Sequence, residues 1–457
     1  MNGHRHTPAL AMLVTAALLS AECCAAAEAS ATPAPAAAAT STAETQVIDL
    51  PTALRLAGLN NLDLALVREA EQQAVAANDS ATLAFFPWLD AGVGYARRTG
   101  AFQQASGVLL EADAELDQRA LSLNAGIDVG AALFNKFAAR QLESAARYQV
   151  EAARNDTALA AAGAYFDLVN AMAATDIAQE AVRISSEYEQ QLQRAFAIGL
   201  SNRSDVLRVG VQTQRYQILL RQAQAAAQSH SATLATVLHL DPTLLLQPLD
   251  RLVVPPTLVP LDGGVAALVS EGLAARPELK SSAAAVAAAQ DAQRSARYGP
   301  LIPSLGASAA AGQVRGGANG DLTDYLGAHD VIIGVQWRIG PGGLLDFGRT
   351  ESADSQLRQQ RLGNEKLRQG IAQQVMDAYT AARAGADQIQ LARRSVELAA
   401  ESLKLSEERK EFGVYAVLEV IQAQQDLTQA RNDYSQALTQ YAKAQYALAH
   451  AAARISE

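Results

Sequence analysis

Two carboxylates stand at equivalent places in the sequence and are the side chains best suited to chemistry. Asp205 and Glu419 each follow a glycine, Gly199 or Gly413, by six residues. Carboxylates held close to one another repel, attract cations and respond to a nearby cation or to pH. The plainer alternative is an acid at a helix start, where the first-turn N–H groups and the helix dipole stabilise it. Both interpretations place these residues where helices begin.

The residue pattern supports no other chemistry. The 6 histidines lack metal-ligand spacing, and no Ser/His/Asp or Cys/His constellation stands out. The segment Gly340-Pro341-Gly342-Gly343 lacks the spacing of a dinucleotide-binding loop and has no βαβ unit around it, so a bend explains its glycines better. We therefore expect no catalytic residue, no bound metal and no cofactor, and a protein that is not an enzyme.

Composition narrows the class of partner. The 457 residues include 37 Lys and Arg against 47 Asp and Glu, a net charge of -10. Because nucleic-acid backbones are bound by clustered Lys and Arg, an acidic chain without a basic block is not expected to bind them. Aromatic residues make up only 5% of the chain and alanine is frequent, which favours long, closely packed helices over a large aromatic-lined pocket.

Residues 1–27 have the pattern of a secretory signal. Arg5 precedes an apolar run over residues 9–19, and Ala25-Ala26-Ala27 offers small residues for cleavage, so the mature chain would start near Glu28. A membrane anchor of one helix is the alternative, and the short apolar run disfavours it.

The only two cysteines, Cys23 and Cys24, belong to this segment. No disulfide, Cys-based zinc site or thiol nucleophile is therefore available in the body of the chain. Lipid attachment at Cys23 is an alternative to simple cleavage, although Glu22 stands where lipoprotein signals want a small residue. Residues 28–46 are rich in Ala, Pro and Thr and predict a flexible tether.

The chain is predicted to contain two copies of one unit. Self-comparison matches segments at an offset of about 215 residues. The matched pairs are 53–59 with 267–273, Pro87-x-Leu89 with Pro303-x-Leu305, and Gly199 plus 205–207 with Gly413 plus 419–421. We place the first copy at residues 47–239, a proline-rich connector at 240–264, and the second copy at 265–457.

Two long stretches without proline predict long helices. From Phe166 to Leu192, apolar residues recur every three or four positions, as in coiled coils. The expected helices are about 136–198 and 201–239 in the first copy and about 346–411 and 417–454 in the second, with glycine turns between. A helix over 136–198 would be roughly 95 Å long, far longer than the helices of ordinary globular domains.

Four shorter segments show the two-residue alternation of strands. They are about 87–97, 120–131, 303–312 and 330–340. Each is about as long as a strand that crosses a bilayer at a tilt. An ordinary half-buried sheet is the alternative, but Asp128 and Arg338 on one side, and no spare amphipathic helix to cover the other, favour lipid on one face. Four strands cannot enclose a lumen, so several copies of the chain must pool them.

With these features the sequence resembles the outer membrane factor (TolC) family, the outer membrane efflux proteins of Gram-negative bacteria. The motifs are Leu54-Arg55-Leu56-Ala57, Arg276-Pro277-Glu278-Leu279, Val335-Gln336-Trp337 with Gly342-Gly343, and Ile198-Gly199-Leu200-Ser201 with Asp205-Val206-Leu207. The resemblance covers residues 47–454. It implies a mainly α protein with a membrane β-barrel: a duplicated helix-strand-strand-helix repeat, four strands per chain, a trimeric twelve-stranded barrel in the outer membrane, and a long coiled-coil tunnel in the periplasm.

The resemblance also implies function and partners. The chain would be a homotrimeric duct of a tripartite efflux system that passively exports drugs or other small solutes. It would contact outer-membrane lipid, a periplasmic adaptor (membrane fusion protein) and an inner-membrane pump of the RND or ABC type. Two alternatives remain open: the outer-membrane channel of a type I protein secretion system and, from another class, a non-channel periplasmic coiled-coil adaptor or scaffold.

Site residues follow from the resemblance, because the helical hairpin ends of this family dock onto adaptors and narrow to a closed aperture. The docking tips would be Ile198, Gly199, Leu200 and Ser201, and Phe412, Gly413 and Val414, where the second tip departs from the family pattern. The periplasmic aperture would be formed by Asp205, Glu419 and Gln422, the last of these neutral where some relatives carry a second acid. Candidates for holding the aperture shut are Arg203, Lys410 and Tyr415.

Overall fold

A computed structural model describes residues 45–99, 102–103, 106–110, 114–318, 321–411 and 417–454. The predicted signal over 1–27, Cys23 within it, and the predicted tether up to residue 44 lie outside the described residues. Within the described part, no helix is both long and apolar enough to cross a membrane.

The helices repeat in order and length between the two halves of the chain. They are α1 (Leu50–Asn60), α2 (Leu62–Leu83), α3 (Val129–Ala197) and α4 (Arg203–Val237), then α5 (Val265–Ala275), α6 (Pro277–Tyr298), α7 (Phe347–Glu411) and α8 (Val417–Ala451). Helices α1 and α5 both have 11 residues, α2 and α6 both have 22, and α4 and α8 both have 35. This repetition agrees with the duplication seen in the sequence.

Polar side chains fix where the first three helices begin. Asp49, Asn61 and Asp128 each precede a helix and accept a hydrogen bond from the N–H three residues later, at 3.0, 3.0 and 2.9 Å. The Asp128 cap corrects the strand predicted over 120–131. Residues beyond Ile127 leave the sheet because the Asp128 carboxylate satisfies a first-turn N–H of α3, so Asp128 does not project from a strand.

Four long strands form one antiparallel sheet. They are β2 (Trp88–Thr99), β5 (Ala114–Ile127), β7 (Ser304–Ala318) and β9 (Leu326–Gln336), in the order β2-β5-β7-β9. The β5–β7 pair joins the two halves of the chain. Three short strands accompany the long ones: β3 (Phe102–Gln103) pairs with β4 (Leu109–Leu110), and β8 (Asp321–Leu322) pairs with β7.

Strand β9 ends before the predicted boundary at residue 340. The carbonyl of Arg338 accepts a hydrogen bond from Leu344 N–H at 2.8 Å, and Gly340 has a φ of 107°. Residues 338–344 therefore form a turn that only glycine enters without strain at Gly340. The expectation that Arg338 projects from a strand is wrong for this reason.

Two segments predicted to be irregular contain a small parallel sheet. Strand β1 (Thr45–Ile48) pairs with β6 (Leu245–Pro248), so the tether ends before residue 45 and the connector is partly ordered. The side chains of Ile48 and Leu246 are buried in the same apolar cluster as residues of α3 and α4. Burial of these side chains orders segments whose local composition favours coil.

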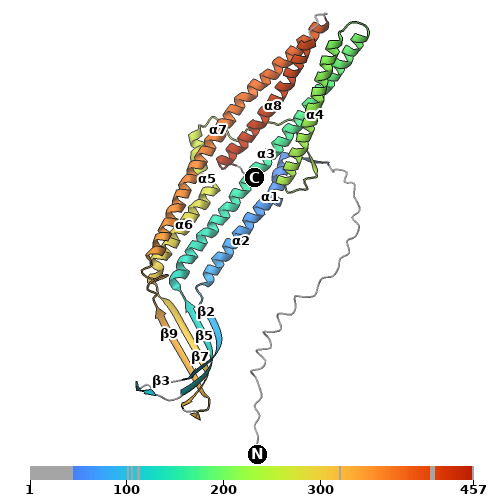
Figure 1. Cartoon of the computed structure of the whole chain (residues 1–457). Coiled ribbons are helices and arrows are strands. Elements are labelled where there is room, and N and C mark those ends of the chain that lie inside the picture. The colour runs from blue at the N-terminus through green and yellow to red at the C-terminus, as the bar shows by residue number, and fades with distance from the viewer. Residues whose placement is uncertain are drawn as a thin grey trace, which may run out of the picture. The chain divides into compact units, whose positions relative to one another are not determined.

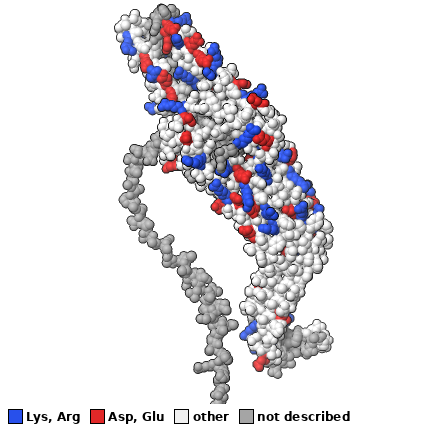
Figure 2. All heavy atoms as spheres, turned by 180° about the vertical axis from the view of Figure 1, so that it is seen from behind, with Lys and Arg blue, Asp and Glu red and all other residues white. Residues whose placement is uncertain are grey.

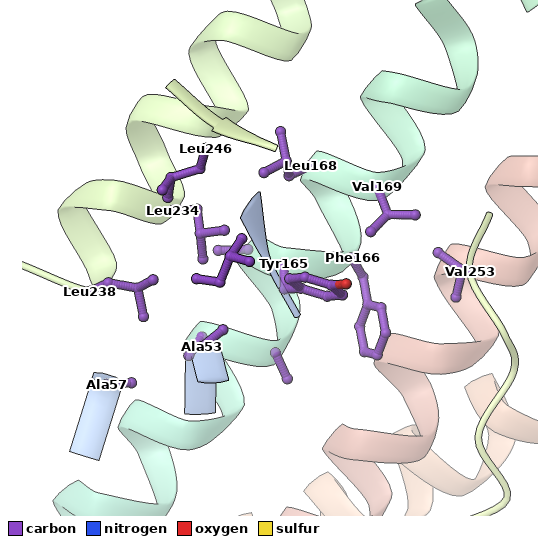
Figure 3. Close-up of a cluster of buried hydrophobic side chains, with 14 of the residues drawn as sticks. Ala53, Ala57, Tyr165, Phe166, Leu168, Val169, Leu234, Leu238, Leu246 and Val253 are labelled. Atoms are coloured by element: carbon purple, nitrogen blue, oxygen red, sulfur yellow. The ribbon is translucent and has the colours of Figure 1, made fainter. Parts of the chain in front are cut away.

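The largest apolar cluster lies where α1, α3, α4 and the small sheet meet (Figure 3). Its members include Ala53, Ala57, Tyr165, Phe166, Leu168, Val169, Leu234, Leu238, Leu246 and Val253. Alanine supplies the close approach between helices, and Tyr165 adds an aromatic body with a polar end. The Tyr165 hydroxyl donates to Asp250 Oδ2 at 2.8 Å, and burial together with this bond raises its pKa.

The residues from Thr45 onward form one elongated unit, with the long strands at one end and the helical hairpins at the other (Figure 1). In Figure 1 the helices lie side by side along the unit, the long strands continue from one end of them, and the α3–α4 and α7–α8 hairpins close the other end. Helix α3 alone has 69 residues, which corresponds to roughly 100 Å of helix. A duplicated, mainly helical chain with four long strands confirms the predicted fold class of the single chain.

Candidate functional site

The first hairpin tip is a tight turn with apolar side chains on its surface. Gly199 has a φ of 78°, its N–H donates to Phe196 O at 3.0 Å, and Leu200 N–H donates to Ala195 O at 2.8 Å. A left-handed glycine with these two bonds satisfies the last carbonyls of α3. Ile198 and Leu200 are exposed beside it. The tip therefore presents two large aliphatic side chains on a fixed turn.

The other predicted tip residues have different surroundings. Ser201 is half-buried, and its Oγ has no hydrogen-bond partner among the described residues. Phe412, Gly413, Val414 and Tyr415 lie outside the described residues, as does the side chain of Lys410. Their predicted roles in docking and in holding the aperture shut stay predictions.

Asp205 lies in the first turn of α4, as the plainer interpretation expected. It is half-buried, and its Oδ1 lies 3.7 Å from Nη1 of Arg208, one turn later on the same helix. Arg203 opens the helix and is exposed. The negative charge of Asp205 is thus stabilised within its own hairpin, by the start of helix α4 and by Arg208.

Glu419 is held by a residue that the sequence did not single out. Arg409 Nη1 donates to Glu419 Oε1 at 2.8 Å, which links the end of α7 to the first turn of α8. Lys410, predicted as a candidate for holding the aperture shut, is the next residue along, and its side chain lies outside the described residues.

Gln422 begins a polar ladder along the exposed side of α8. Its Nε2 donates to Asp426 Oδ1 at 3.1 Å, and Gln429 Nε2 donates to Asp433 Oδ1 at 2.8 Å. Glu419, Asp426 and Asp433 recur at heptad spacing and are all exposed. A second acid therefore does follow Gln422, one turn later. This heptad repeat is visible in the sequence as Glu419, Asp426 and Asp433.

The two hairpins pack against each other below their tips. Tyr188 and Leu192 of α3 share a buried cluster with Leu403 of α7 and with Val420 and Ile421 of α8. A polar contact joins α8 to α4 as well, since Gln425 Nε2 donates to Gln212 Oε1 at 2.8 Å. The structure thus brings together the hairpin that carries Asp205 and the hairpin that carries Glu419.

The sheet carries an apolar band on one face. The strand register places on this face Leu89, Ala91 and Val93 of β2, Leu121, Leu123, Ala125 and Ile127 of β5, Leu305, Ala307, Ala309 and Ala311 of β7, and Val331, Ile333 and Val335 of β9. Val93 is 88% exposed and Ile333 is 82% exposed. We call this set the apolar band. Exposed apolar surface of this extent marks an interface with lipid or protein.

The opposite face of the sheet has a different composition. Glycine, alanine and polar residues predominate there, including Gly92, Ser122, Asn124 and Ser308. The exceptions are Trp88, Leu116, Val314, Leu326 and Ile332. Figure 2 shows charged side chains spread over the helices but sparse over the sheet until its far end. The sheet therefore has one apolar and one mainly small or polar face, as the sequence alternation predicted.

One cluster of polar side chains among the helices contains residue types that can bind a cation. Ligand atoms of Asp156, Glu278 and His450 lie within 4.8 Å of one another, and His450 Nε2 lies 2.8 Å from Asp156 Oδ1. Arg276 already donates to both carboxylate oxygens of Glu278. His450 thus joins α8 to Asp156 of α3, and Glu278 already has Arg276 as its partner, so the cluster is accounted for without a cation.

Comparison with known proteins agrees with this geometry. Residues 268–454 match the family model described as outer membrane efflux protein. No curated protein matches the sequence. Among solved structures, the outer-membrane channel OprN is 18% identical, with 88% of this chain and 89% of that chain covered and a TM-score of 0.72.

Two further solved structures give the same result. The Campylobacter jejuni CmeC outer membrane channel is 18% identical, with 89% of this chain and 87% of that chain covered and a TM-score of 0.74. The outer membrane protein VceC of Vibrio cholerae is 16% identical, with 88% and 95% covered and a TM-score of 0.71. Residues 268–454 thus match the outer membrane efflux protein family, as the resemblance in the sequence implied, and the chain as a whole has the fold of outer-membrane channels.

Proposed function

We propose that the protein is the outer-membrane channel of a tripartite efflux system, a duct through which drugs or other small solutes pass. The observation that carries this proposal is the apolar band, which lies on one face of a sheet whose other face is mainly small or polar. If lipid covers the apolar band and water covers the other face, each face is in the solvent that suits its side chains. Passage requires an open, wetted path and no catalytic residue, so the energy comes from a pump.

The sheet of one chain needs partners at both edges. Among the described strands, β2 pairs only with β5, and β9 pairs only with β7. An exposed edge of this length presents a row of N–H and C=O groups that another strand can pair with. Three chains that each contribute four long strands would close a twelve-stranded barrel in which no edge remains.

Exposed aliphatic residues on the helices support the same assembly. Leu391, Leu398 and Leu405 of α7 are exposed at heptad spacing, and α4 exposes Leu207, Val211 and Ile218. Heptad-spaced leucines on a long helix are the pattern by which helices pack side by side in coiled coils. In a homotrimer these two surfaces would meet between neighbouring chains and form the wall of a periplasmic tunnel.

The hairpin tips would contact the remaining partners. Ile198 and Leu200 give the first tip an exposed apolar surface, which suits a periplasmic adaptor (membrane fusion protein). The adaptor would connect the duct to an inner-membrane pump of the RND or ABC type. We expect Leu200→Asp to weaken adaptor binding at least tenfold in a pull-down from membranes, because it places a charge in an apolar contact.

Fractionation and conductance test the proposed function. We expect the full-length chain in the outer-membrane fraction, as a detergent-extracted trimer that runs faster on gels before heating, and to conduct ions in planar bilayers. A strain that lacks the gene should become more susceptible to several drugs and recover on complementation. Recovery of the protein as a non-conducting species in the soluble or inner-membrane fraction would support a coiled-coil scaffold instead.

A further inference from the structure

Helices α4 and α7 each carry a stripe of exposed side chains along an edge of the unit. Within the chain, α4 packs against α3, α8 and β6, and α7 packs against α5, α6 and α8. Near the hairpin tips, α4 and α7 therefore lie at opposite edges, with α3 and α8 between them (Figure 1). Each of these two helices leaves one face open to a neighbouring molecule.

The stripe on α4 alternates between polar and aliphatic side chains. Its members are Arg208, Val211, Arg215, Ile218, Gln222 and Ala225, all of them exposed. Alternating steps of three and four residues keep these side chains on one side of the helix. Part of this side is a shallow hollow lined by Gln214, Gln217, Ile218, Arg221, Gln222 and Ala225. In coiled coils, a side chain of the partner helix inserts into a hollow of this kind.

The stripe on α7 has the same spacing and a different set of charges. Its members are Leu391, Arg394, Leu398, Glu401, Leu405 and Glu408, all of them exposed. Leucine alternates here with one arginine and then, toward the tip, with two glutamates. The α4 stripe carries its two arginines in the half nearest the tip. The two stripes therefore have opposite charges at the same level of the unit.

Symmetry decides which parts of the two stripes can meet. A rotation about an axis along the unit keeps every residue at its own height, so a stripe of one chain faces residues of equal height in the next chain. Helix α4 begins at Arg203 and α7 ends at Glu411, and both tips close the same end of the unit (Figure 1). Val209 of α4 and Leu403 of α7 belong to one buried cluster. The two helices are thus antiparallel, and their relative height is fixed to within about one turn.

Within this range, one register matches every member of the two stripes. It places Ile218 opposite Leu398. One turn nearer the tip, Arg215 lies opposite Glu401. The remaining levels pair Arg208 with Glu408, Val211 with Leu405, Gln222 with Arg394 and Ala225 with Leu391. A shift of one turn in one direction sets Arg215 against Leu398. A shift in the other direction sets Ile218 against Glu401, so either shift places a charge against an aliphatic side chain.

The central charges of this register are available for pairing between chains. Arg215 and Glu401 make no hydrogen bond or ion pair within the part of the chain that the structure describes. The other charged members already make exposed contacts on their own helices: Arg208 with Asp205, Arg394 with Glu397 and Glu408 with Lys404. Because exposed contacts of that kind contribute little, we assign the selectivity of the interface to Arg215 and Glu401.

We propose that α4 of each chain packs antiparallel against α7 of the next chain in this register, and that the Arg215–Glu401 pair makes the contact selective for other copies of this chain. The inference rests on the proposed function, because the trimer supplies the neighbouring chain, and it specifies which residues meet there. The aliphatic levels supply the affinity. A like charge at either central position opposes the contact, so the pair acts against chains of other sequence.

Cysteine cross-linking of the full-length trimer tests the register. The only two cysteines of the chain, Cys23 and Cys24, lie in the predicted signal, so the native chain supplies the background. With a short bismaleimide reagent, Ile218→Cys/Leu398→Cys should give cross-linked dimers and trimers on denaturing gels. Each single variant should give the background level, because a cysteine at one position alone has no partner in the next chain.

Two further cysteine pairs control for height and for helix face. Ile218→Cys/Leu391→Cys keeps the second cysteine on the stripe but moves it about 10 Å farther from the tip. Ile218→Cys/Ala400→Cys keeps nearly the same height but uses another side of α7. Both controls should cross-link at least about tenfold less than the predicted pair, because the reagent is shorter than the added distance. An equal yield from either control, or a product that contains a different protein in place of a second copy, would overturn the inference.

Exchange of the two central charges tests selectivity. Arg215→Glu faces Glu401 with a like charge and should lower the yield of trimer. Arg215→Glu/Glu401→Arg restores attraction between its own copies, but not with the native chain. When it is co-expressed with a differently tagged native chain, mixed trimers should form at least about fivefold less often than between two native chains.

Arg183→Glu/Glu187→Arg is the matched control for this exchange. It reverses an exposed ion pair within α3, away from both stripes, and should mix freely with the native chain. Free mixing of the Arg215→Glu/Glu401→Arg chain with the native chain would overturn the proposed selectivity, as would equal exclusion of the α3 control.

Conductance separates this inference from the proposed function. All variants are measured in planar bilayers first, so that only conducting trimers are compared. If native trimers conduct but the predicted pair does not cross-link, the register is wrong and the channel stands. If the native chain forms no conducting trimer, the proposed function fails, and the inference that rests on it fails as well.

Discussion

Arg409 and Glu419 form an ion pair with Nη1 and Oε1 2.8 Å apart, and this pair crosses from the last turns of α7 to the first turn of α8. Both side chains are exposed, and such pairs contribute only about 0.2–1 kcal/mol to stability. Burial of Leu403, Val417 and Ile421 holds the hairpin together instead. The ion pair therefore sets the position of a carboxylate near the tip more than it stabilises the fold.

Charge reversal at Glu419 should open the tip. In Glu419→Lys the new ammonium faces Arg409, and two cations at this distance repel each other and separate the ends of the two helices. We expect a higher single-channel conductance in planar bilayers. The swap Arg409→Glu/Glu419→Lys restores an attractive pair and should return conductance toward the native value.

Asp205→Lys examines the first hairpin in the same assay. The substitution replaces a half-buried carboxylate beside Arg208 with a cation, so we expect lower selectivity for cations over anions. Unchanged conductance and selectivity in both Asp205→Lys and Glu419→Lys would exclude the two residues from the pore.

The leucine stripe of α7 should determine trimer stability. Leu398→Asp introduces a charge among exposed leucines that we place between chains, where a buried leucine contributes about 1.5–3 kcal/mol per site. The trimer should dissociate at a lower temperature on semi-denaturing gels. Ala400→Asp changes an exposed residue on another side of the same helix and should leave this temperature unchanged. Equal effects of the two substitutions would remove the stripe from the subunit contact.

Arg276 is a buried anchor between the start of α6 and α7. It is 5% exposed, donates to Glu278, and donates through Nη1 to Gln374 Oε1 at 2.6 Å. Arg276→Met leaves Glu278 without its partner, and breaking a buried pair costs about 3–5 kcal/mol. Urea unfolding in detergent should show a loss of this size.

Arg297→Met is the control for Arg276. Arg297 lies on the same helix and pairs with Asp354 at 3.4 Å, but its side chain is exposed and Asp354 keeps a hydrogen bond from Gln293, so we expect a loss below about 1 kcal/mol. Similar unfolding curves for the two variants would contradict the anchoring role.

Asp346 should give the stability of α7 a pH dependence. Its carboxylate accepts from Gly342 N–H at 2.7 Å and from Arg349 N–H at 3.0 Å, and these bonds lower its pKa. The stabilisation is complete above the ordinary aspartate pKa of about 3.9 and is lost as pH falls through the lowered folded-state pKa.

Asp346→Ala is expected to unfold at a lower temperature than the native protein at neutral pH. The difference should shrink as pH falls toward about 3, because protonation removes the same hydrogen-bond acceptor from the native chain. Circular dichroism of the detergent-solubilised trimer measures both curves. A difference that stays constant over this range would exclude the carboxylate as its source.

Periodicity predicted the elements well, while boundaries depended on single side chains. The alternation through residues 120–131 identified β5, but nothing in that alternation indicates that Asp128 caps α3 instead. Strands β1 and β6 have 4 residues each and pair although they lie at opposite ends of the first repeat. Their stability therefore comes from burial of Ile48 and Leu246 and not from local strand propensity. The residue pattern within a short segment does not show which distant segments will bury its side chains.

The candidate sites divide in the same way. Asp205 and Glu419 could be predicted because they occupy equivalent positions in the two repeats. Both lie in the first turns of helices. The ion pair of Asp117 with Arg315 could not be predicted, because the two residues are far apart in sequence and meet only through the register of β5 with β7. The register between two strands must be known before such a pair can be identified.

The pairing of β5 with β7 also imposes an order in time. Strand β5 ends at Ile127 and β7 begins at Ser304. The two central strands of the sheet therefore cannot pair until the chain has been synthesised well into its second half. Until then the β2–β5 hairpin has an unpaired strand edge and an exposed apolar face. Both features favour aggregation of incomplete chains. The unpaired edge of β5 therefore stays exposed until β7 is available, and the chain is most prone to aggregation during that interval.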